Sequence, residues 1–363
     1  MPRAKRKKAL TALSIVGARP QFIKLQPIHN ALIAKKWHHI IVHTGQHYDD
    51  RLSRQFFKEL RIPKPDLNLG VGSGSHGYQT GRVMERLDDI LQQARPDVVI
   101  VYGDTNATVA GALAAEKLHI PVAHIEAGMR SYNREMPEEI NRVATDHVAT
   151  YHFCANFEAK KNLRREGISN HVFVVGDVMI DVLRQLLPKI PKRQSKPYAL
   201  VTVHRPSNTD DPVRLRKLLK QLSTLRLPVI LPAHPRLLAR IKAQGLGHLA
   251  RKESIQFMPA AGYRHMLTLQ RNATVIITDS GGIQKEAYYL KIPCITLRKE
   301  TEWTATVTTG WNTLVKGSLD QLGEKVRSLR RPKGHPSLFG NGDAAQKVIR
   351  HLGNALTSKK RKS

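Results

Sequence analysis

The chain contains very little cysteine and no long apolar run. Cys154 and Cys294 are the only cysteines among 363 residues, and each lies in an apolar, strand-like segment. Because disulfide frameworks are dense in cysteine, we interpret both as reduced core residues, which is typical of a cytoplasmic protein. The longest apolar runs, such as DVVIVYGD, have the length of a strand and are too short to span a membrane.

Recognisable metal and dinucleotide motifs are also missing. None of the 17 histidines belongs to an H-E-x-x-H motif, so the sequence predicts no metal site. The stretch GSGSHG at 72–77 formally matches G-x-G-x-x-G. However, the residues before it make a poor strand. The Asp or Glu that would bind the ribose is also missing from the end of a following strand. We therefore expect a mobile loop at 72–77 and no nicotinamide cofactor.

Acidic residues are scarce, with 29 Asp and Glu against 59 Lys and Arg, which gives a formal net charge of +30. Nucleic-acid binding needs basic patches of this kind. No helix-turn-helix pattern, zinc spacing or aromatic-rich RNA motif accompanies them, so we expect no nucleic-acid partner. We interpret the charge as a basic solvated surface together with two basic tails, at 1–12 and 358–363.

Short β-branched runs alternate with helical stretches along most of the chain, a pattern typical of βαβ units and parallel sheets. The expected strands lie at 10–17, 39–45, 97–104, 120–128, 150–156, 172–177, 198–204, 227–234, 274–280 and 292–297. A break rich in proline and basic residues at 188–197 predicts an interdomain linker. The fold class is therefore α/β, with two doubly wound, Rossmann-like domains at 13–187 and 198–340 and a C-terminal helix at 341–357.

Polar residues stand at the carboxyl ends of five of these runs. They are Asp104, Glu126, His204, His234 and Ser280. Ligands of doubly wound sheets bind at this edge. One such residue alone is as compatible with a structural role as with a functional one, but the five together favour a ligand site.

The stretch TDSGGIQKEA combines a Ser-Gly-Gly turn with a predicted helix that carries Glu286 on its first turn. Gly281 and Gly282 let the backbone approach a ligand closely, and the helix start offers unpaired N–H groups to an anion. Ser280 adds a hydroxyl, and Glu286 can accept hydrogen bonds from two sugar hydroxyls. These groups fit a nucleoside diphosphate, whereas the alternative is a plain helix N-cap formed by Ser280 or Asp279.

Three further stretches supply charged candidates with a less specific signal. VGARPQFIK places Arg19 and Lys24 after the first strand, where they either reach a phosphate or a base or belong to the ordinary surface. REMPEEINR places Glu138 in the first turn of a helix, where acids also serve the helix dipole, so a catalytic role is left open. TGQHYDD supplies Gln46 and His47 with the same ambiguity.

Seven stretches that occur in order together resemble the non-hydrolysing UDP-N-acetylglucosamine 2-epimerase family. They are VGARPQFIK, TGQHYDD, GDTNATVAGALAA, HIEAGMRS, MPEEINR, VTVHR and TDSGGIQKEA, and the resemblance runs from about Leu13 to Val315. It implies a glycosyltransferase-B-type architecture with the active site in the interdomain cleft and a last helix able to pack back on the first domain. It also implies a homodimer, a UDP-sugar substrate, and no metal, nicotinamide or pyridoxal cofactor.

The resemblance implies epimerisation at C2 of a UDP-N-acetylamino sugar. The C2 proton is removed as UDP departs from C1, and UDP adds back to the glycal after protonation of C2 from the other face. One group must therefore act as a base and another as an acid, while cations hold the diphosphate.

The resemblance also assigns roles to the candidate residues. Its catalytic group is Asp104, Glu126, Glu138 and His204, with the base and the acid not distinguished. Its UDP contacts are Arg19, Lys24, His234, Ser280, Gly281, Gly282 and Glu286. Gln46 and His47 are the candidates for contacting a second UDP-sugar that acts as an allosteric activator.

Three positions depart from the family pattern. Ser207 stands where a glutamate is expected, Trp303 replaces an arginine of the simple epimerases, and Ala305 replaces an acid. TEW followed by GWN resembles the branch that acts on UDP-2,3-diacetamido-2,3-dideoxyglucuronate, whose extra carboxylate suits a basic site. A more distant alternative is a UDP-dependent glycosyltransferase, which would need an acceptor pocket but not three carboxylates around one carbon.

Overall fold

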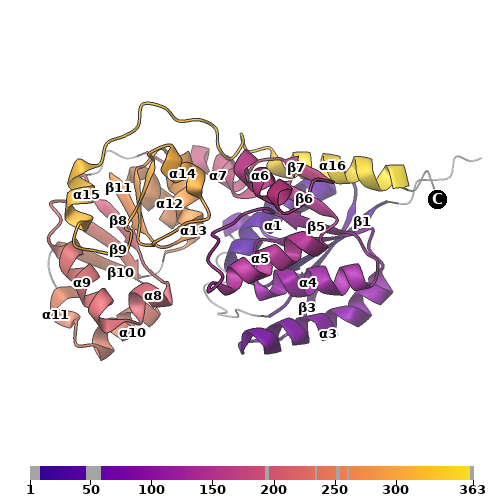
Figure 1. The fold of residues 1–363 in the computed structure, drawn as a ribbon, viewed down its shortest axis with the longest axis horizontal. Helices are drawn as coiled ribbons and strands as arrows, with labels where there is room; N and C mark the ends of the chain where they lie inside the picture. Colours follow the sequence, from indigo (N-terminus) through magenta and orange to yellow (C-terminus); the bar gives the residue numbers. More distant parts are fainter. Residues whose placement is uncertain are drawn as a thin grey trace, which may run out of the picture. The chain divides into compact units, whose positions relative to one another are not determined.

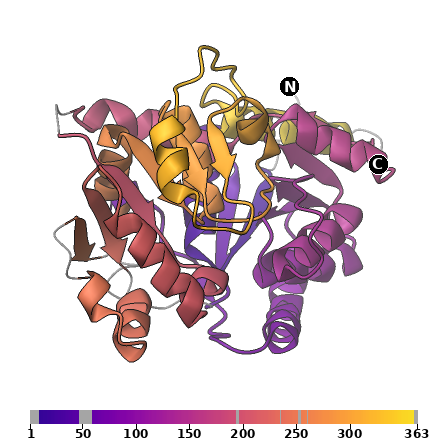
Figure 2. The ribbon, with the colours of Figure 1, turned by 60° about the vertical axis from the view of Figure 1, so that its left-hand side comes forward.

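The computed structural model describes residues 9–45, 59–192, 196–233, 235–250, 254–259 and 261–359. The chain divides into two compact units, which we call unit 1 (1–185 and 339–363) and unit 2 (186–338). In each unit, helices pack on a twisted sheet (Figures 1 and 2). None of the helices in the described ranges is both long and apolar enough to cross a membrane.

Unit 1 is built on a seven-stranded sheet with the order β3-β2-β1-β4-β5-β6-β7, in which every pair is parallel. Its strands are β1 (Thr11–Val16), β2 (His38–His43), β3 (Leu67–Asn68), β4 (Val98–Tyr102), β5 (Val122–Ile125), β6 (Tyr151–Cys154) and β7 (Val172–Val174). Its helices are α1 (Arg19–Ala34), α3 (His76–Ala94), α4 (Asn106–Lys117), α5 (Pro137–Val148), α6 (Phe157–Arg165), α7 (Val178–Leu186) and α16 (Ala344–Lys359). The strand order reverses between β1 and β4, which makes this the topological switch point of the sheet.

Unit 2 repeats the scheme with six parallel strands in the order β10-β9-β8-β11-β12-β13. The strands are β8 (Ala199–Thr202), β9 (Val229–Ala233), β10 (Ile255–Pro259), β11 (Val275–Thr278), β12 (Cys294–Thr296) and β13 (Asn312–Leu314). The helices are η1 (Leu187–Lys189), α8 (Pro206–Thr209), α9 (Pro212–Ser223), α10 (Pro235–Ala243), α11 (Gly247–Ala250), α12 (Tyr263–Asn272), α13 (Gly281–Tyr289), α14 (Thr304–Thr308) and α15 (Leu322–Ser328). Here the order reverses between β8 and β11.

All ten strands expected from the sequence are present, and the doubly wound α/β fold class is confirmed. The central strands are apolar on both faces because helices cover both sides of a parallel sheet; every residue of β4, for example, is fully buried. The sequence analysis missed β3, β10 and β13. Each of these forms an edge of its sheet, and the two residues of β3 are exposed, so an apolar run is missing there.

The prediction of a mobile loop over 72–77 was wrong for its last residues. Helix α3 already begins at His76, and the Ser75 hydroxyl caps it by accepting the backbone N–H of Tyr78 at 3.3 Å. Serine in an extended conformation before a helix is a favourable N-cap, so the local chemistry of this stretch is that of a helix start.

Where the chain re-enters unit 1 at Phe339, it packs against Gly176. A Cβ on this residue would lie 2.8 Å from the carbonyl oxygen of Phe339, and its φ of +95° lies in the left-handed region, so only glycine fits. Helix α16 then begins where the Asp181 carboxylate accepts the backbone N–H groups of Ala344 and Ala345 at 3.1 and 2.8 Å. From there α16 packs against α1 within unit 1 (Figure 1).

This cap should make stability depend on pH. Burial raises the pKa of Asp181 from 3.8 to about 6; the N–H groups of α16 lower it, and Asp177 and Asp343 raise it. Because the folded value exceeds the unfolded one, Asp181 contributes stability that is full below pH 3.8 and is lost as the pH rises through about 6. We expect the urea midpoint of the wild type, measured relative to that of Asp181→Asn, to be lower in mildly alkaline buffer than in mildly acidic buffer. A difference independent of pH would contradict this assignment.

Candidate active site

Gln21 joins two loops at the switch point of unit 1. Its side-chain oxygen accepts the backbone N–H groups of Gly17 and Ala18 at 2.7 and 2.9 Å. Its side-chain nitrogen donates to the carbonyl oxygen of Tyr102 at 2.8 Å and to the hydroxyl of Thr105 at 3.0 Å. The start of α1 is thereby tied to the loop between β4 and α4. The sequence analysis did not identify this buried glutamine.

Lys24 on α1 forms an ion pair with Glu126, the first residue after β5. The two side chains are only 8% and 12% exposed. Glu126 has a φ of +75°, a left-handed conformation that is uncommon for a residue other than glycine. The structure thus pairs a predicted UDP contact with a predicted catalytic residue, and it holds the carboxylate in a strained turn of the kind that clusters at functional sites.

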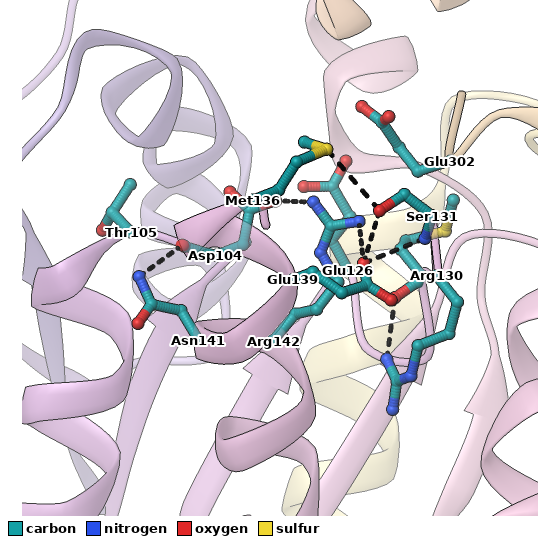
Figure 3. A network of polar contacts seen from close by, with 12 residues as sticks. Asp104, Thr105, Glu126, Arg130, Ser131, Met136, Glu139, Asn141, Arg142 and Glu302 are labelled. Carbon is teal, nitrogen blue, oxygen red and sulfur yellow. Dashed lines mark hydrogen bonds and ion pairs between the residues drawn. The ribbon is translucent and has the colours of Figure 1, made fainter. Parts of the chain in front are cut away.

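Asp104, after β4, is bound by two side chains of helix α5 (Figure 3). Its carboxylate forms an ion pair with Arg142, whose other terminal nitrogen donates to Glu139 at 3.1 Å. The Asn141 side chain donates to the Asp104 carbonyl oxygen at 3.0 Å. The Asp104 side chain is 34% exposed whereas that of Arg142 is 3% exposed, so a ligand can reach the carboxylate while its charge partner stays buried. The sequence analysis missed Arg142, which lies four residues after Glu138 and hence on the same face of the helix.

The two neighbouring glutamates of α5 have different surroundings. Glu139 is buried, and its carboxylate accepts the backbone N–H groups of Ser131 and Tyr132 at 2.9 Å each. Glu138 is partly exposed, and within the described ranges its carboxylate has no hydrogen-bond or ion-pair partner. Glu139 therefore organises the preceding loop, and Glu138 is the carboxylate that remains available to a ligand.

In unit 2, buried Asp279 organises the loops after β8 and β11 at the second switch point. Its carboxylate accepts the backbone N–H groups of His204 and Arg205 at 3.2 and 3.0 Å and the side-chain amide of Asn208 at 2.9 Å. His204 Nδ1 lies 3.1 Å from Asp279 Oδ1, while the His204 side chain is 57% exposed. Burial alone would raise the pKa of Asp279, but these partners outweigh it and lower the pKa.

This pairing orients the imidazole of His204 and makes Nε2 the nitrogen that a ligand can contact. The sequence analysis considered Asp279 only as a helix cap. Its place directly before the Ser-Gly-Gly turn was visible, but its contact with His204 requires β8 and β11 to be neighbours, as the sheet order shows.

Helix α13 begins at the predicted Ser-Gly-Gly turn. Ser280 stands at the N-cap position but makes no side-chain capping bond, so its hydroxyl is not used by the helix. A Cβ on Gly281 would lie 2.5 Å from Glu302 Oε1 and 3.1 Å from Trp303 Nε1. The side chains of Glu302 and Trp303 therefore pack closely against the first glycine, and a larger residue there would have to displace the end of the Glu302 side chain.

Glu286 lies in the second turn of α13, and its predicted place in the first turn was wrong because the helix starts at Gly281. Its carboxylate is buried and accepts hydrogen bonds from the Tyr263 hydroxyl at 2.8 Å and from Gln270 Nε2 at 2.6 Å. These two bonds fix the position of the carboxylate.

Trp303 is buried, and the Lys285 ammonium lies 4.0 Å above its ring centroid, a cation–π arrangement. The neighbouring Glu302 accepts a hydrogen bond from Arg298 at 2.9 Å. Of the other departures, Ser207 lies in α8 and Ala305 in α14.

For four of the predicted site residues the structure gives no side-chain contact. Arg19 is the first residue of α1, and Gln46, His47 and His234 lie outside the described residues. Across the described ranges, no group of three His, Cys, Asp or Glu side chains is placed to hold a metal ion.

A family model described as UDP-N-acetylglucosamine 2-epimerase matches residues 30–353. The chain belongs to this family. The epimerase is 42% identical to the UDP-2,3-diacetamido-2,3-dideoxy-D-glucuronate 2-epimerase of Pseudomonas aeruginosa, over 94% of this chain and 98% of that protein. It is also 42% identical to the UDP-N-acetylglucosamine 2-epimerase of Methanocaldococcus jannaschii, over 93% of this chain and 97% of that protein.

Solved structures confirm the glycosyltransferase-B-type fold. The M. jannaschii UDP-GlcNAc 2-epimerase, in a crystal structure with UDP-GlcNAc and UDP, superposes with a TM-score of 0.89 at 40% identity, covering 95% of this chain and all of that one. The glycosyltransferase SnogD from Streptomyces nogalater has a TM-score of 0.52 at 13% identity, over 98% and 99% of the two chains, and shares the fold alone. By its family, the present chain is an isomerase.

Gly103 offers a test of the geometry of unit 1. It has a φ of +67°, and a Cβ there would lie 3.1 Å from Lys24 Nζ and 3.3 Å from Glu126 Oε2. We expect Gly103→Ala to lower the free energy of unfolding by about 1–3 kcal/mol through backbone strain. Gly81 is the control: it is exposed within α3, with no atom within 4 Å of an added Cβ. Gly81→Ala should be neutral or stabilising by up to about 1 kcal/mol. Equal urea midpoints for the two variants would contradict the assignment.

Proposed function

We propose that this epimerase interconverts a UDP-N-acetylamino sugar and its C2 epimer, as in the reaction between UDP-N-acetylglucosamine and UDP-N-acetylmannosamine, without hydrolysis. The observation that carries the proposal is the pair of carboxylate–cation contacts at the ends of neighbouring strands β4 and β5. There, Asp104 pairs with Arg142 and Glu126 pairs with Lys24. A binding module or a simple transferase has no need for two such groups beside the accessible Glu138.

The reaction explains the need for several carboxylates. The C2 proton is not adjacent to a carbonyl, so it leaves together with UDP, and a glycal with a C1–C2 double bond results. We propose that Asp104, Glu126 and Glu138 supply the base and the acid for the two faces of C2. His204, oriented by Asp279, then stabilises the diphosphate as negative charge develops on it.

For the nucleotide we propose the start of α13 as the phosphate site, because backbone N–H groups at a helix start favour anions. The Ser280 hydroxyl is not used by the helix, which supports its role as a donor to a phosphate. Glu286 is the proposed ribose acceptor. The remaining proposed contacts to UDP are Arg19, Lys24, His234, Gly281 and Gly282. We propose no metal or organic cofactor.

A second candidate substrate is UDP-2,3-diacetamido-2,3-dideoxyglucuronate. It is favoured by Trp303 in place of the expected arginine and by the 42% identity to the P. aeruginosa enzyme that bears this name. Identity alone does not decide between the two substrates, because the UDP-N-acetylglucosamine 2-epimerase of M. jannaschii is 42% identical as well.

We further propose a cytoplasmic homodimer, with a second UDP-sugar near Gln46 and His47 as an activator.

Exchange of the C2 proton with solvent tests the reaction itself. In D₂O, proton NMR of UDP-N-acetylglucosamine with the wild type should show loss of the C2 proton signal and the appearance of the manno epimer. Asp104→Asn and Glu126→Gln should each slow this exchange by about 100-fold or more, as for a lost general acid or base. UDP affinity, measured by calorimetry, should stay within a few-fold. A wild type that binds UDP but exchanges no proton with either candidate sugar would favour the glycosyltransferase alternative.

The ratio of kcat/KM values for the two sugars tests the substrate. We expect UDP-N-acetylglucosamine to be preferred by about tenfold or more, which corresponds to about 1.4 kcal/mol of differential transition-state binding. The opposite preference in a direct competition would identify the diacetamido-glucuronate as the substrate and would leave the reaction class unchanged.

A further inference from the structure

Helix α5 carries a charged stripe that extends past the residues used so far. Glu138, Arg142 and Asp146 are spaced four residues apart and therefore lie on one face of the helix. Arg142 bonds to Asp104, whereas Asp146, one turn further on, is completely buried at the side chain. A buried carboxylate is costly unless charges and donors surround it.

Asp146 is surrounded by donors from β5 and from the segment that follows it. Its Oδ1 lies 2.7 Å from His124 Nδ1. Its Oδ2 accepts the backbone N–H of Gly128 at 3.0 Å and the guanidinium of Arg130 at 2.7 Å. Burial would raise the pKa of Asp146, but His124 and Arg130 outweigh it and lower the pKa. Glu166 balances the charge by accepting two bonds from Arg130, at 2.7 and 2.6 Å.

His124 connects Asp146 to the loop that follows β4. Its Nε2 donates to the carbonyl oxygen of Gly103 at 2.8 Å. The ring therefore bridges the Asp146 carboxylate and the Gly103 carbonyl oxygen. Gly103 directly precedes Asp104, and Gly128 follows Glu126 by two residues. One buried carboxylate is therefore bonded, directly or through one ring, to the backbone of both loops that carry the proposed catalytic carboxylates.

We propose that Asp146 is a positioning residue for the epimerisation, acting through His124 and Gly128 on the loops of Asp104 and Glu126. This inference rests on the proposed function. Asp146 does not touch the substrate; it sets the spacing of the groups that act on C2. Because proton transfer requires heavy atoms within hydrogen-bond reach, a misplacement of about 1 Å is expected to cost about 100-fold in rate.

Two substitutions of Asp146 distinguish an effect on the position of the catalytic loops from an effect on protein stability alone. In Asp146→Asn, the side-chain amide can donate to Nδ1 of a His124 ring that keeps its proton on Nε2, and its oxygen can still accept from Gly128 and Arg130. The loops then stay linked without the charge. In Asp146→Ala the link is cut. We expect kcat for C2 proton exchange to fall by about 100-fold in Asp146→Ala and to recover to within about tenfold of the wild type in Asp146→Asn, with KM and UDP affinity unchanged in both.

Asp181→Ala is the matched control, because Asp181 is a partly buried carboxylate of unit 1 that also accepts backbone N–H groups, there from α16. It should lower the urea midpoint and leave kcat per folded molecule unchanged. If Asp146→Ala does not fold, His124→Ala replaces it. This change removes the ring that links Asp146 to Gly103, leaves the bond from Gly128 to Asp146, and should lower kcat by about tenfold or more.

The outcomes separate the two proposals. A folded Asp146→Ala, or its His124→Ala substitute, with wild-type kcat would overturn the positioning role while the reaction stands. A folded Asp146→Asn as slow as the alanine variant would overturn it as well, because the restored bonds should rescue the rate. If the wild type exchanges no C2 proton, the proposed function falls, and the role of Asp146 in that reaction falls with it.

Discussion

A charge inside a protein must be paired where it is buried, and this constraint determines the arrangement of unit 1. Arg142 lies between Asp104 and Glu139, and Asp146 lies between His124 and Arg130. Removing one partner would leave an uncompensated charge without water, which costs several kcal/mol. The buried charges of helix α5 are therefore all paired, and these pairs hold the loops after β4 and β5 to the helix.

The two units solve the same problem in a similar way. In each, a buried aspartate near the switch point accepts backbone N–H groups from a loop and faces Nδ1 of a histidine, namely Asp146 with His124 and Asp279 with His204. The difference lies in exposure. The ring of His124 is fully buried and donates onward to the backbone, whereas the ring of His204 is largely exposed. The same kind of pair thus links two loops in unit 1 and leaves an imidazole accessible to a ligand in unit 2.

The success of the sequence analysis follows from which features are local. Apolar runs predicted ten strands, nine of them inner and one, β7, at an edge. The rule that ligands bind at strand ends selected Asp104, Glu126 and His204 as candidates without knowledge of any contact. Edge strands such as β3 bury little and have no comparable pattern. Asp146 and Asp279 were missed as organising residues because their roles depend on partners that are distant in the sequence, such as His124 for Asp146 and Arg205 for Asp279, and only the fold brings these near. The turn that carries Glu286 was misplaced because a helix start is defined by backbone contacts rather than by composition.

The departure at Trp303 can be understood by the same argument about charge. Lys285 is buried, and the ring of Trp303 covers its ammonium, while the neighbouring Glu302 is bonded to Arg298. An arginine at position 303 would place a second cation against Lys285 in a region with little water, which costs far more than the cation–π contact gains. The tryptophan and the lysine therefore pack as a pair, and the side chains of Glu302 and Trp303 lie close to Gly281. The start of α13 thus packs against residues that come about 20 positions later in the chain, so we expect a substitution at position 303 to affect the proposed phosphate site through this contact.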